Sequence, residues 1–315
     1  MPVCFRSDTR DASASLSVVV ASMHDPALLR ATLRALVPQC AAHHAELLVA
    51  RAGDPRQLAG IAREHPSVRL IEVAGDGALH SVRAAGLAAA GGGWTALTED
   101  HCVPDDDWVA VMGRHAAGGV DVVGGRMDNA HGARALDWGA FFAEYGSYAA
   151  ESAQQHDGVL LTAANVGYSR AVLADVVAWM SRGAWENVVH DRLRAAGHRI
   201  VFDPSARVVL QRRHTFGAFA AERFRHGRDY ARARLVEEPR NRRWQRIVTG
   251  PLLPPLLLWR VARGAARSAP RVRAFARALP YMVVFFGAWA IGEIVGYVQG
   301  SSGATPHRVT HGIRR

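Results

Sequence analysis

The chain has 315 residues, of which 49% are hydrophobic, so it can hold one sizeable α/β domain with an appendage and is not a disordered or fibrous protein. Its basic residues are all arginines and are unevenly distributed along the sequence. The part up to Arg207 has 18 Arg and 23 acids (net −5), and the part after it has 20 Arg and 5 acids (net +15). Its 3 cysteines lack a Cys-x-x-Cys spacing, so neither a disulfide framework nor a cysteine zinc site is indicated, and no secretory signal is recognisable.

Strand and helix patterns alternate over the first 210 residues. Leu16–Ala21 is a β-branched apolar run typical of a buried strand, and Asp25-Pro26 has the cap and the proline of a helix start. The alternation continues through Glu46–Ala50, Asp54–His65, Val68–Val73, Leu79–Ala90, Trp94–Thr98, Val120–Gly124, Asp137–Ala150, Ala184–Ala196 and Arg199–Phe202. It predicts an α/β fold with a mostly parallel sheet and helices on both faces.

The remainder of the chain has a different texture. An arginine-rich helix is expected over Phe216–Leu235, followed by a break at Glu237–Pro239 and a proline-containing apolar stretch, Ile247–Ala262. Leu279–Val298 is long enough to cross a hydrocarbon core. We therefore expect a disordered start (1–14), an α/β domain (15–214), an amphipathic interface region (215–246), membrane-associated helices (247–298) and a flexible tail (299–315).

Three side chains able to bind a metal directly follow the Trp94–Thr98 strand, namely Glu99, Asp100 and His101. Ligands of parallel α/β sheets gather beyond the carboxyl ends of the strands, so this position favours a divalent-ion or donor site. A polar turn that caps the next helix is the alternative.

The order of these motifs resembles the family-2 glycosyltransferases of the GT-A fold, from Leu16 to about Arg234. In that family the Glu99–His101 position holds an Asp-x-Asp motif. The resemblance implies that Asp100 contacts a sugar nucleotide, and that His101, with Glu99, holds Mn²⁺ or Mg²⁺. Histidine makes Mn²⁺ the better candidate.

The same resemblance implies further donor-binding residues. Ser22 stands where the family has the threonine of a Pro-Thr pair, and Arg83 lies in a segment similar to Ala-Arg-Asn-x-Gly. At the second strand the chain departs from the family, because Ala50–Asp54 replaces Val-Asp-Asp-Gly-Ser and its usual base contact. Arg51 is a substitute contact for a base or phosphate, or else an exposed strand-end arginine.

A second catalytic match runs from Trp185 to Ile200 and resembles Glu-Asp-x-x-Leu-x-x-Arg-Leu-x-x-x-Gly-x-x-Ile. Glu186 falls at the catalytic carboxylate, which would act as a general base. It could also serve only as an acid in a first helical turn. Trp185, His190 and Asp191 are the candidate acceptor-side residues, and His190 could instead support Glu186.

Two segments between these motifs are weaker candidates. Asn165 lies in a stretch similar to the family's Gly-Asn-x-x-x-x-Arg and could bond the sugar or merely form a turn. Gly125 belongs to a Gly-Gly pair where backbone could approach the sugar.

After the last strand the family often has a metal-binding histidine, so His214 is a third ligand candidate. Arg212 or Arg213 could neutralise the leaving diphosphate, or could begin the basic helix that follows.

Taken together, the sequence predicts an enzyme that transfers a sugar from a nucleotide-sugar donor to a lipid-linked or polysaccharide acceptor. The reaction would be inverting and metal-dependent, at the cytoplasmic face of the cell membrane. Because the arginines alternate with long apolar runs, a membrane partner is favoured over nucleic acid. The altered Ala50–Asp54 strand end leaves a non-catalytic membrane adaptor as the alternative.

Overall fold

The structure is a computed structural model, and it describes residues 15–52, 55–74, 78–130, 132–148, 160–235 and 240–300. The chain forms two compact units. The first consists of Met1–His214 together with Arg260–Leu279, and the second of Thr215–Trp259 together with Pro280–Arg315. The predicted disordered start, the predicted break at 237–239 and residues 301–315 of the predicted tail lie outside the described residues.

The first unit is built on one eight-stranded sheet with the strand order β3-β2-β1-β4-β7-β6-β8-β5. The strands are β1 Leu16–Ser22, β2 Glu46–Ala52, β3 Arg69–Val73, β4 Trp94–Glu99, β5 Cys102–Pro104, β6 Val122–Asn129, β7 Asn165–Ser169 and β8 Ile200–Leu210. The four strands β3, β2, β1 and β4 are parallel neighbours, and so are β6 and β8. The predicted mostly parallel sheet is therefore confirmed.

The antiparallel strand β7 was not predicted as a strand. It lies between β4 and β6 and runs against both. Its sequence, Asn-Val-Gly-Tyr-Ser, is typical of a turn, but its Gly167 lies flat against the Trp94 indole, where a side chain would clash. Burial in the middle of the sheet thus overrides the local preference.

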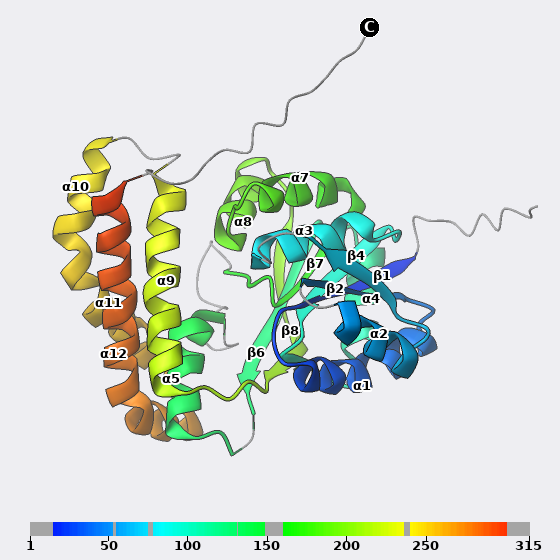
Figure 1. Cartoon of the computed structure of the whole chain (residues 1–315), viewed down its shortest axis with the longest axis horizontal. Helices are drawn as coiled ribbons and strands as arrows, with labels where there is room; N and C mark the ends of the chain where they lie inside the picture. Colours follow the sequence, from blue (N-terminus) through cyan, green and yellow to red (C-terminus); the bar gives the residue numbers. More distant parts are fainter. Residues whose placement is uncertain are drawn as a thin grey trace, which may run out of the picture. The chain divides into compact units, whose positions relative to one another are not determined.

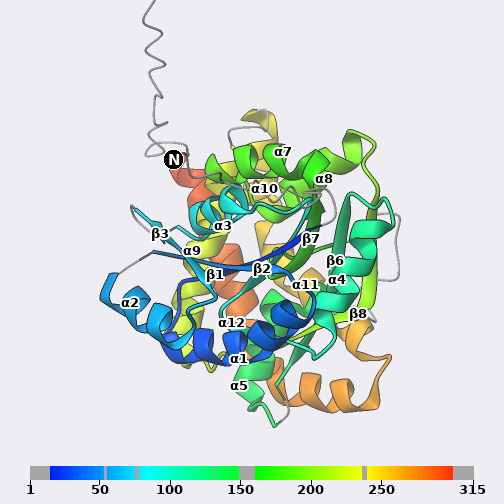
Figure 2. The same ribbon diagram turned by 90° about the vertical axis from the view of Figure 1, so that its right-hand side faces the viewer.

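Helices cover both faces of this sheet, as predicted. The helices of the first unit are α1 Pro26–Ala42, α2 Pro55–Glu64, α3 Leu79–Ala89, α4 Trp108–Ala117, α5 Ala135–Glu144, α7 Arg170–Ser181 and α8 Glu186–Ala195, with a 3₁₀ turn at Gly146–Tyr148. α3, α7 and α8 cover one face, and α1, α2 and α4 the other (Figures 1 and 2). A buried apolar cluster lies under α3, α7 and α8.

Two helix ends behave as their sequences require. The Asp25 side chain accepts a hydrogen bond of 2.7 Å from the Ala27 N–H and so caps α1, with Pro26 in the first turn. α8 ends at Ala195, and Gly197 after its cap has a φ of 84°, the left-handed conformation that glycine adopts most easily. These ends orient α1 and α8, whose N-termini both lie at the site described below.

The second unit contains α9 Phe216–Arg234, α10 Arg240–Thr249, a 3₁₀ turn at Gly250–Leu252, and parts of α11 Leu253–Ala265 and α12 Ala269–Gln299. α9 and α12 approach closely through glycines on both helices. A Cβ on Gly227 would meet the Trp289 carbonyl, and one on Gly292 or Gly296 would meet backbone of α9. The Gly292-x-x-x-Gly296 spacing thus lets two helix backbones come into contact.

α12 is the one helix in the described part of the chain that is long and apolar enough to cross a membrane. It has 31 residues, and its most apolar window has a mean hydropathy of 1.7. It contains the predicted Leu279–Val298 stretch.

Gly125 illustrates how tightly β6 is packed beside β7 and β8. A Cβ at this position would clash with the Ala206 carbonyl and the Asn165 amide. We expect Gly125→Ala to lower the free energy of unfolding by about 1–3 kcal/mol, measured by equilibrium urea unfolding.

The matched control is Gly113→Ala, in the middle of α4, where no described atom beyond the helix's own backbone lies within 4 Å of the added methyl group. Because alanine is the better helix former, that variant should gain about 0.5–1 kcal/mol. Equal stabilities of the two variants would contradict the packing argument.

Candidate active site

The carboxyl ends of β1, β2 and β4 meet at one edge of the sheet. Ser22 at the end of β1 is in register with Arg51 on β2, and Ala21 with Glu99 on β4. Residues that are far apart in the sequence therefore converge here, as expected for the ligand-binding edge of parallel strands.

Asp100 organises this edge. Its Oδ2 accepts hydrogen bonds from the Ser22 hydroxyl and from the backbone N–H groups of Met23 and His24, at 2.7–2.9 Å. Its Oδ1 lies 2.7 Å from Nδ1 of His24. The carboxylate is fully buried, and although burial opposes ionisation, the hydrogen bonds from His101 and His24 hold its pKa well below the usual range.

Arg51 braces the same turn. Its guanidinium donates to the Ser22 hydroxyl at 2.6 Å and to the His24 carbonyl at 2.9 Å, and it lies 3.9 Å from Asp100. The residue is 6% exposed, so it is a buried arginine rather than an exposed strand-end residue. Contacts of Ser22, Arg51 and Asp100 with a donor stay predictions.

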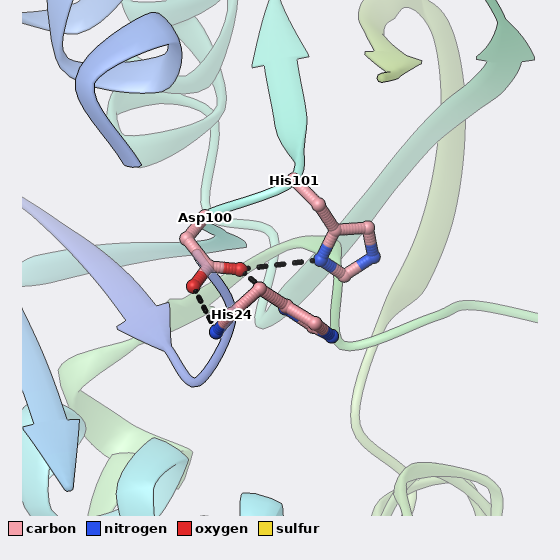
Figure 3. A group of neighbouring side chains, drawn as sticks. All are labelled: His24, Asp100 and His101. Atoms are coloured by element: carbon pink, nitrogen blue, oxygen red, sulfur yellow. Dashed lines mark hydrogen bonds and ion pairs between the residues drawn. The ribbon is translucent and has the colours of Figure 1, made fainter. Parts of the chain in front are cut away.

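His24, Asp100 and His101 form a group that can hold a metal ion. Their ligand atoms lie within 4.8 Å of one another, and the two imidazole rings are 4.6 Å apart (Figure 3). Both rings direct Nδ1 at the Asp100 carboxylate, at 2.7 Å from His24 and 3.4 Å from His101. Two imidazoles and a carboxylate suit a divalent transition ion such as Mn²⁺.

No sequence motif points to His24 as a ligand. The feature that could have identified it is its position two residues beyond the end of β1, the parallel neighbour of β4. Strand adjacency, rather than sequence spacing, brings it to His101. Glu99 and His214, the other two predicted ligands, are not members of this group, and their role as ligands stays a prediction.

Arg83 links Glu99 to Glu186. Its guanidinium forms a short ion pair with Glu99 and donates to Glu186 Oε2 at 3.1 Å. Burial disfavours a charged arginine, but Glu99 and Glu186 raise the pKa of Arg83, so it stays protonated. Arg83 and His101 in turn lower the pKa of Glu99 against the effect of burial. The metal-binding group and the start of α8 are thus connected through one buried ion-pair chain.

His101 is anchored on its other side by Tyr145. The phenolic oxygen lies 3.2 Å from His101 Nε2, and Nε2 is also 3.6 Å from Glu99. Burial is the main cause that raises the pKa of Tyr145, so the phenol stays protonated. These contacts fix the His101 ring with Nδ1 toward Asp100.

The other α8 residues occupy different environments. Glu186 is the first residue of the helix, with Trp185 as its cap residue. His190 is buried, with Nε2 at 2.9 Å from the Tyr168 hydroxyl, and burial lowers its pKa to about 3. Asp191 is exposed and pairs with Arg194 at 2.6 Å. Acceptor contacts of Trp185, His190 and Asp191 stay predictions.

Asn165 and Gly125 lie together inside the sheet. The Asn165 amide donates to the carbonyls of Arg126 and Ala206 at 3.1 and 2.8 Å, and its oxygen accepts from the Trp108 indole at 2.9 Å. This network ties β7 to β6, β8 and α4. Asn165 therefore has a structural role in joining these elements, and a sugar contact by Asn165 or Gly125 stays a prediction.

His214 lies at the end of the first unit. Its backbone N–H donates to Asp137 at 3.0 Å and its carbonyl accepts from Arg134 at 2.9 Å. Its ring is buried. The segment Gln211–Arg213 lines a small cleft of about 80 Å³ with Asn129 and Arg134.

This sheet and the site at its edge define a GT-A fold of the kind found in nucleotide-sugar transferases. The profile of the family described as "Glycosyltransferase like family 2" matches residues 13–228. The chain belongs to this family and is a glycosyltransferase, as the sequence motifs predicted. Among curated proteins, no sequence matches the chain.

One solved structure supports the same fold. The chain is similar to the mannosyltransferase PcManGT from Pyrobaculum calidifontis in complex with GDP-Man and Mn²⁺, with a TM-score of 0.53 and 16% identity over 89% of this chain and 86% of that one. It also matches glucosyl-3-phosphoglycerate synthase from Mycobacterium tuberculosis in complex with phosphoglyceric acid, with a TM-score of 0.44 and 18% identity over 67% and 77% of the two chains.

The metal-binding group leads to a test on His24. We expect His24→Ala to weaken Mn²⁺ binding at least about tenfold, because it removes one of three ligands, with free Mn²⁺ measured by electron paramagnetic resonance. His43→Ala, at an exposed position after α1, is the control and should bind Mn²⁺ like the unaltered protein. Unchanged affinity in His24→Ala would show that this residue is not a ligand.

Proposed function

We propose that the protein transfers a sugar with inversion from a nucleotide-sugar donor to a hydroxyl-bearing acceptor, with Glu186 as the general base. The observation that carries this proposal is the Arg83 bridge. It holds the Glu186 carboxylate in a fixed relation to Glu99 and, through Glu99, to His101. A base and a site for the leaving diphosphate are then adjacent, as such a transfer requires.

The chemistry assigned to these residues is a single displacement. The acceptor oxygen forms a bond to the anomeric carbon while the bond from that carbon to the diphosphate oxygen breaks, and the acceptor proton passes to Glu186. The Glu186 side chain is 14% exposed, so it is reachable from the site but largely shielded from water. Arg83 stays charged and orients this carboxylate.

A divalent ion bound by His24, Asp100 and His101 would supply positive charge against the leaving diphosphate. The similar structure of PcManGT contains GDP-Man and Mn²⁺, which supports a nucleotide sugar and Mn²⁺ as ligands of this chain. Ser22 and Arg51, beside Asp100, are then the residues available to the nucleotide.

The second unit supports membrane attachment. Large apolar side chains on α10, on α11 and in the turn between them are exposed, with Trp244 at 68%, Val248 at 75%, Leu252 at 66% and Trp259 at 53%. Trp244 and Val248 are four residues apart on α10 and so share one face of that helix. An exposed apolar row among arginines is typical of a helix in a lipid interface.

The charge distribution supports the cytoplasmic leaflet as the site of attachment. Residues 208–315 carry 20 Arg and 5 acids, and this surplus is attracted to the anionic lipids of that leaflet. With α12 as a further anchor, a lipid-linked or polysaccharide acceptor at this surface is the proposed second substrate.

Glu186→Gln tests the proposed base. The amide keeps the side-chain shape but cannot take up the proton, so single-turnover transfer should fall about 10²–10⁴-fold while donor affinity changes little. Asp175→Asn, at an exposed position of α7, is the control and should transfer at the normal rate. Near-normal transfer by Glu186→Gln would exclude it as the base.

A spin label on Val248 tests the membrane contact. In a background with Cys4→Ser, where Cys40 and Cys102 are buried, Val248→Cys gives a single exposed labelling position on α10. In the presence of anionic vesicles, dissolved oxygen should increase the relaxation rate of the spin label. A water-soluble nickel complex should change that rate little, because the lipid shields the label from it.

Leu160→Cys is the matched control, since Leu160 is a 48% exposed residue of the α/β unit. Its label should remain open to the nickel complex. Equal nickel access at both positions would contradict insertion of the α10 face.

A further inference from the structure

A wide cleft lies where β6 and β8 end against the beginning of α12, all within the first unit. Its volume is about 510 Å³. Its polar and aromatic lining includes Arg126, Asp128, Asn129, Trp138, Arg207 and Arg271. None of these residues belongs to the metal-binding group or to the Arg83 ion-pair chain.

Three arginines converge on one carboxylate in this cleft. Asp128 lies 2.7 Å from Arg126, 2.8 Å from Arg207 and 2.7 Å from Arg271. Arg207 has a second acid partner, Asp105, at 2.9 Å. Three guanidinium groups against two carboxylates leave a net positive charge at this cluster.

Two buried donors in the lining have no acceptor among the residues that the structure describes. These are the Nε of Arg126 and the Nδ2 of Asn129, both shielded from solvent. The Asn129 residue is 8% exposed. An unsatisfied buried donor is unfavourable, and a bound anion that accepts from both groups would remove this penalty.

The remaining walls also suit an anion with an apolar attachment. α12 begins at Ala269, and Ser268, Pro270 and Arg271 line the cleft, so the positive end of a helix lies beside it. Trp138 and Val209 add apolar surface. A phosphate ester has both parts, the charged head for the arginines and an organic group for the apolar wall.

The cleft is close to the metal-binding group. Asn129 is in register with Leu210 on β8, and Leu210 with Cys102 on β5, the residue after His101. Two strand spacings of about 4.8 Å place Asn129 about 10 Å from Cys102. A ligand in this cleft can therefore reach the site where the sugar is transferred.

We propose that this cleft binds a phosphate monoester carried by the acceptor, held by Arg126, Asn129 and Arg271. The inference rests on the proposed function, because it names the class of the acceptor. Asp128 spaces the arginines for the phosphate oxygens, and Arg-to-phosphate contacts can be bidentate.

The test measures binding of phenyl phosphate to the full-length protein by calorimetry, with EDTA present so that metal-dependent binding does not contribute. Arg126→Gln should weaken binding about tenfold, because one charge-assisted contact is lost. Asp128 keeps Arg207 and Arg271 in this variant, so the fold is retained. Asn129→Ala should weaken binding as well.

Arg114→Gln is the matched control, since Arg114 is an exposed arginine on α4. It should bind phenyl phosphate like the unaltered protein. The proposal is overturned if the unaltered protein does not bind, if Arg126→Gln binds equally well, or if Arg114→Gln is weakened to the same extent.

A second arm separates the two sources of a phosphate ester. Dodecyl phosphate binding at least about tenfold tighter than phenyl phosphate, with the same loss in Arg126→Gln, would assign the site to a lipid phosphate. Equal affinities would assign it to a water-soluble ester. Neither binding measurement depends on sugar transfer. Failure of the phosphate site and failure of Glu186 as the base can therefore be told apart.

Discussion

The buried carboxylate of Asp100 is the interaction on which the site depends. It accepts from the Ser22 hydroxyl, from two backbone N–H groups and from the His24 ring, and so fixes the turn between β1 and α1. A buried charge with fewer partners would cost several kcal/mol, and this network supplies the compensation. Because the turn is fixed, His24 lies beside His101 and Arg51 lies beside Ser22.

The fold could be predicted as far as local patterns carry information. The Asp25-Pro26 start of α1 and the parallel strands β1 to β4 follow from short sequence signals, and the structure has them within a few residues of the predicted limits. β7 could not be predicted, because its polar and glycine residues favour a turn by themselves. Only the neighbours β4 and β6, with Trp94 against Gly167, make it a strand.

The site shows the same division between local and long-range information. His101 and Glu186 are recognisable because each belongs to a motif at a helix or strand end. The bridge connects Arg83 to Glu99, 16 positions away, and to Glu186, 103 positions away. No sequence spacing encodes such contacts. The cleft around Asp128 likewise needs Arg271, which is 143 positions away and returns to the first unit after the chain has left it.

The glycine contact between α9 and α12 has a consequence for where the protein can exist. Gly227, Gly292 and Gly296 let the two backbones meet, so close van der Waals packing contributes to the stability of the helix pair. Such packing does not require water to be expelled, and it remains favourable when acyl chains replace water as the surrounding medium. The contact between the two backbones therefore keeps its geometry whichever medium surrounds the helices.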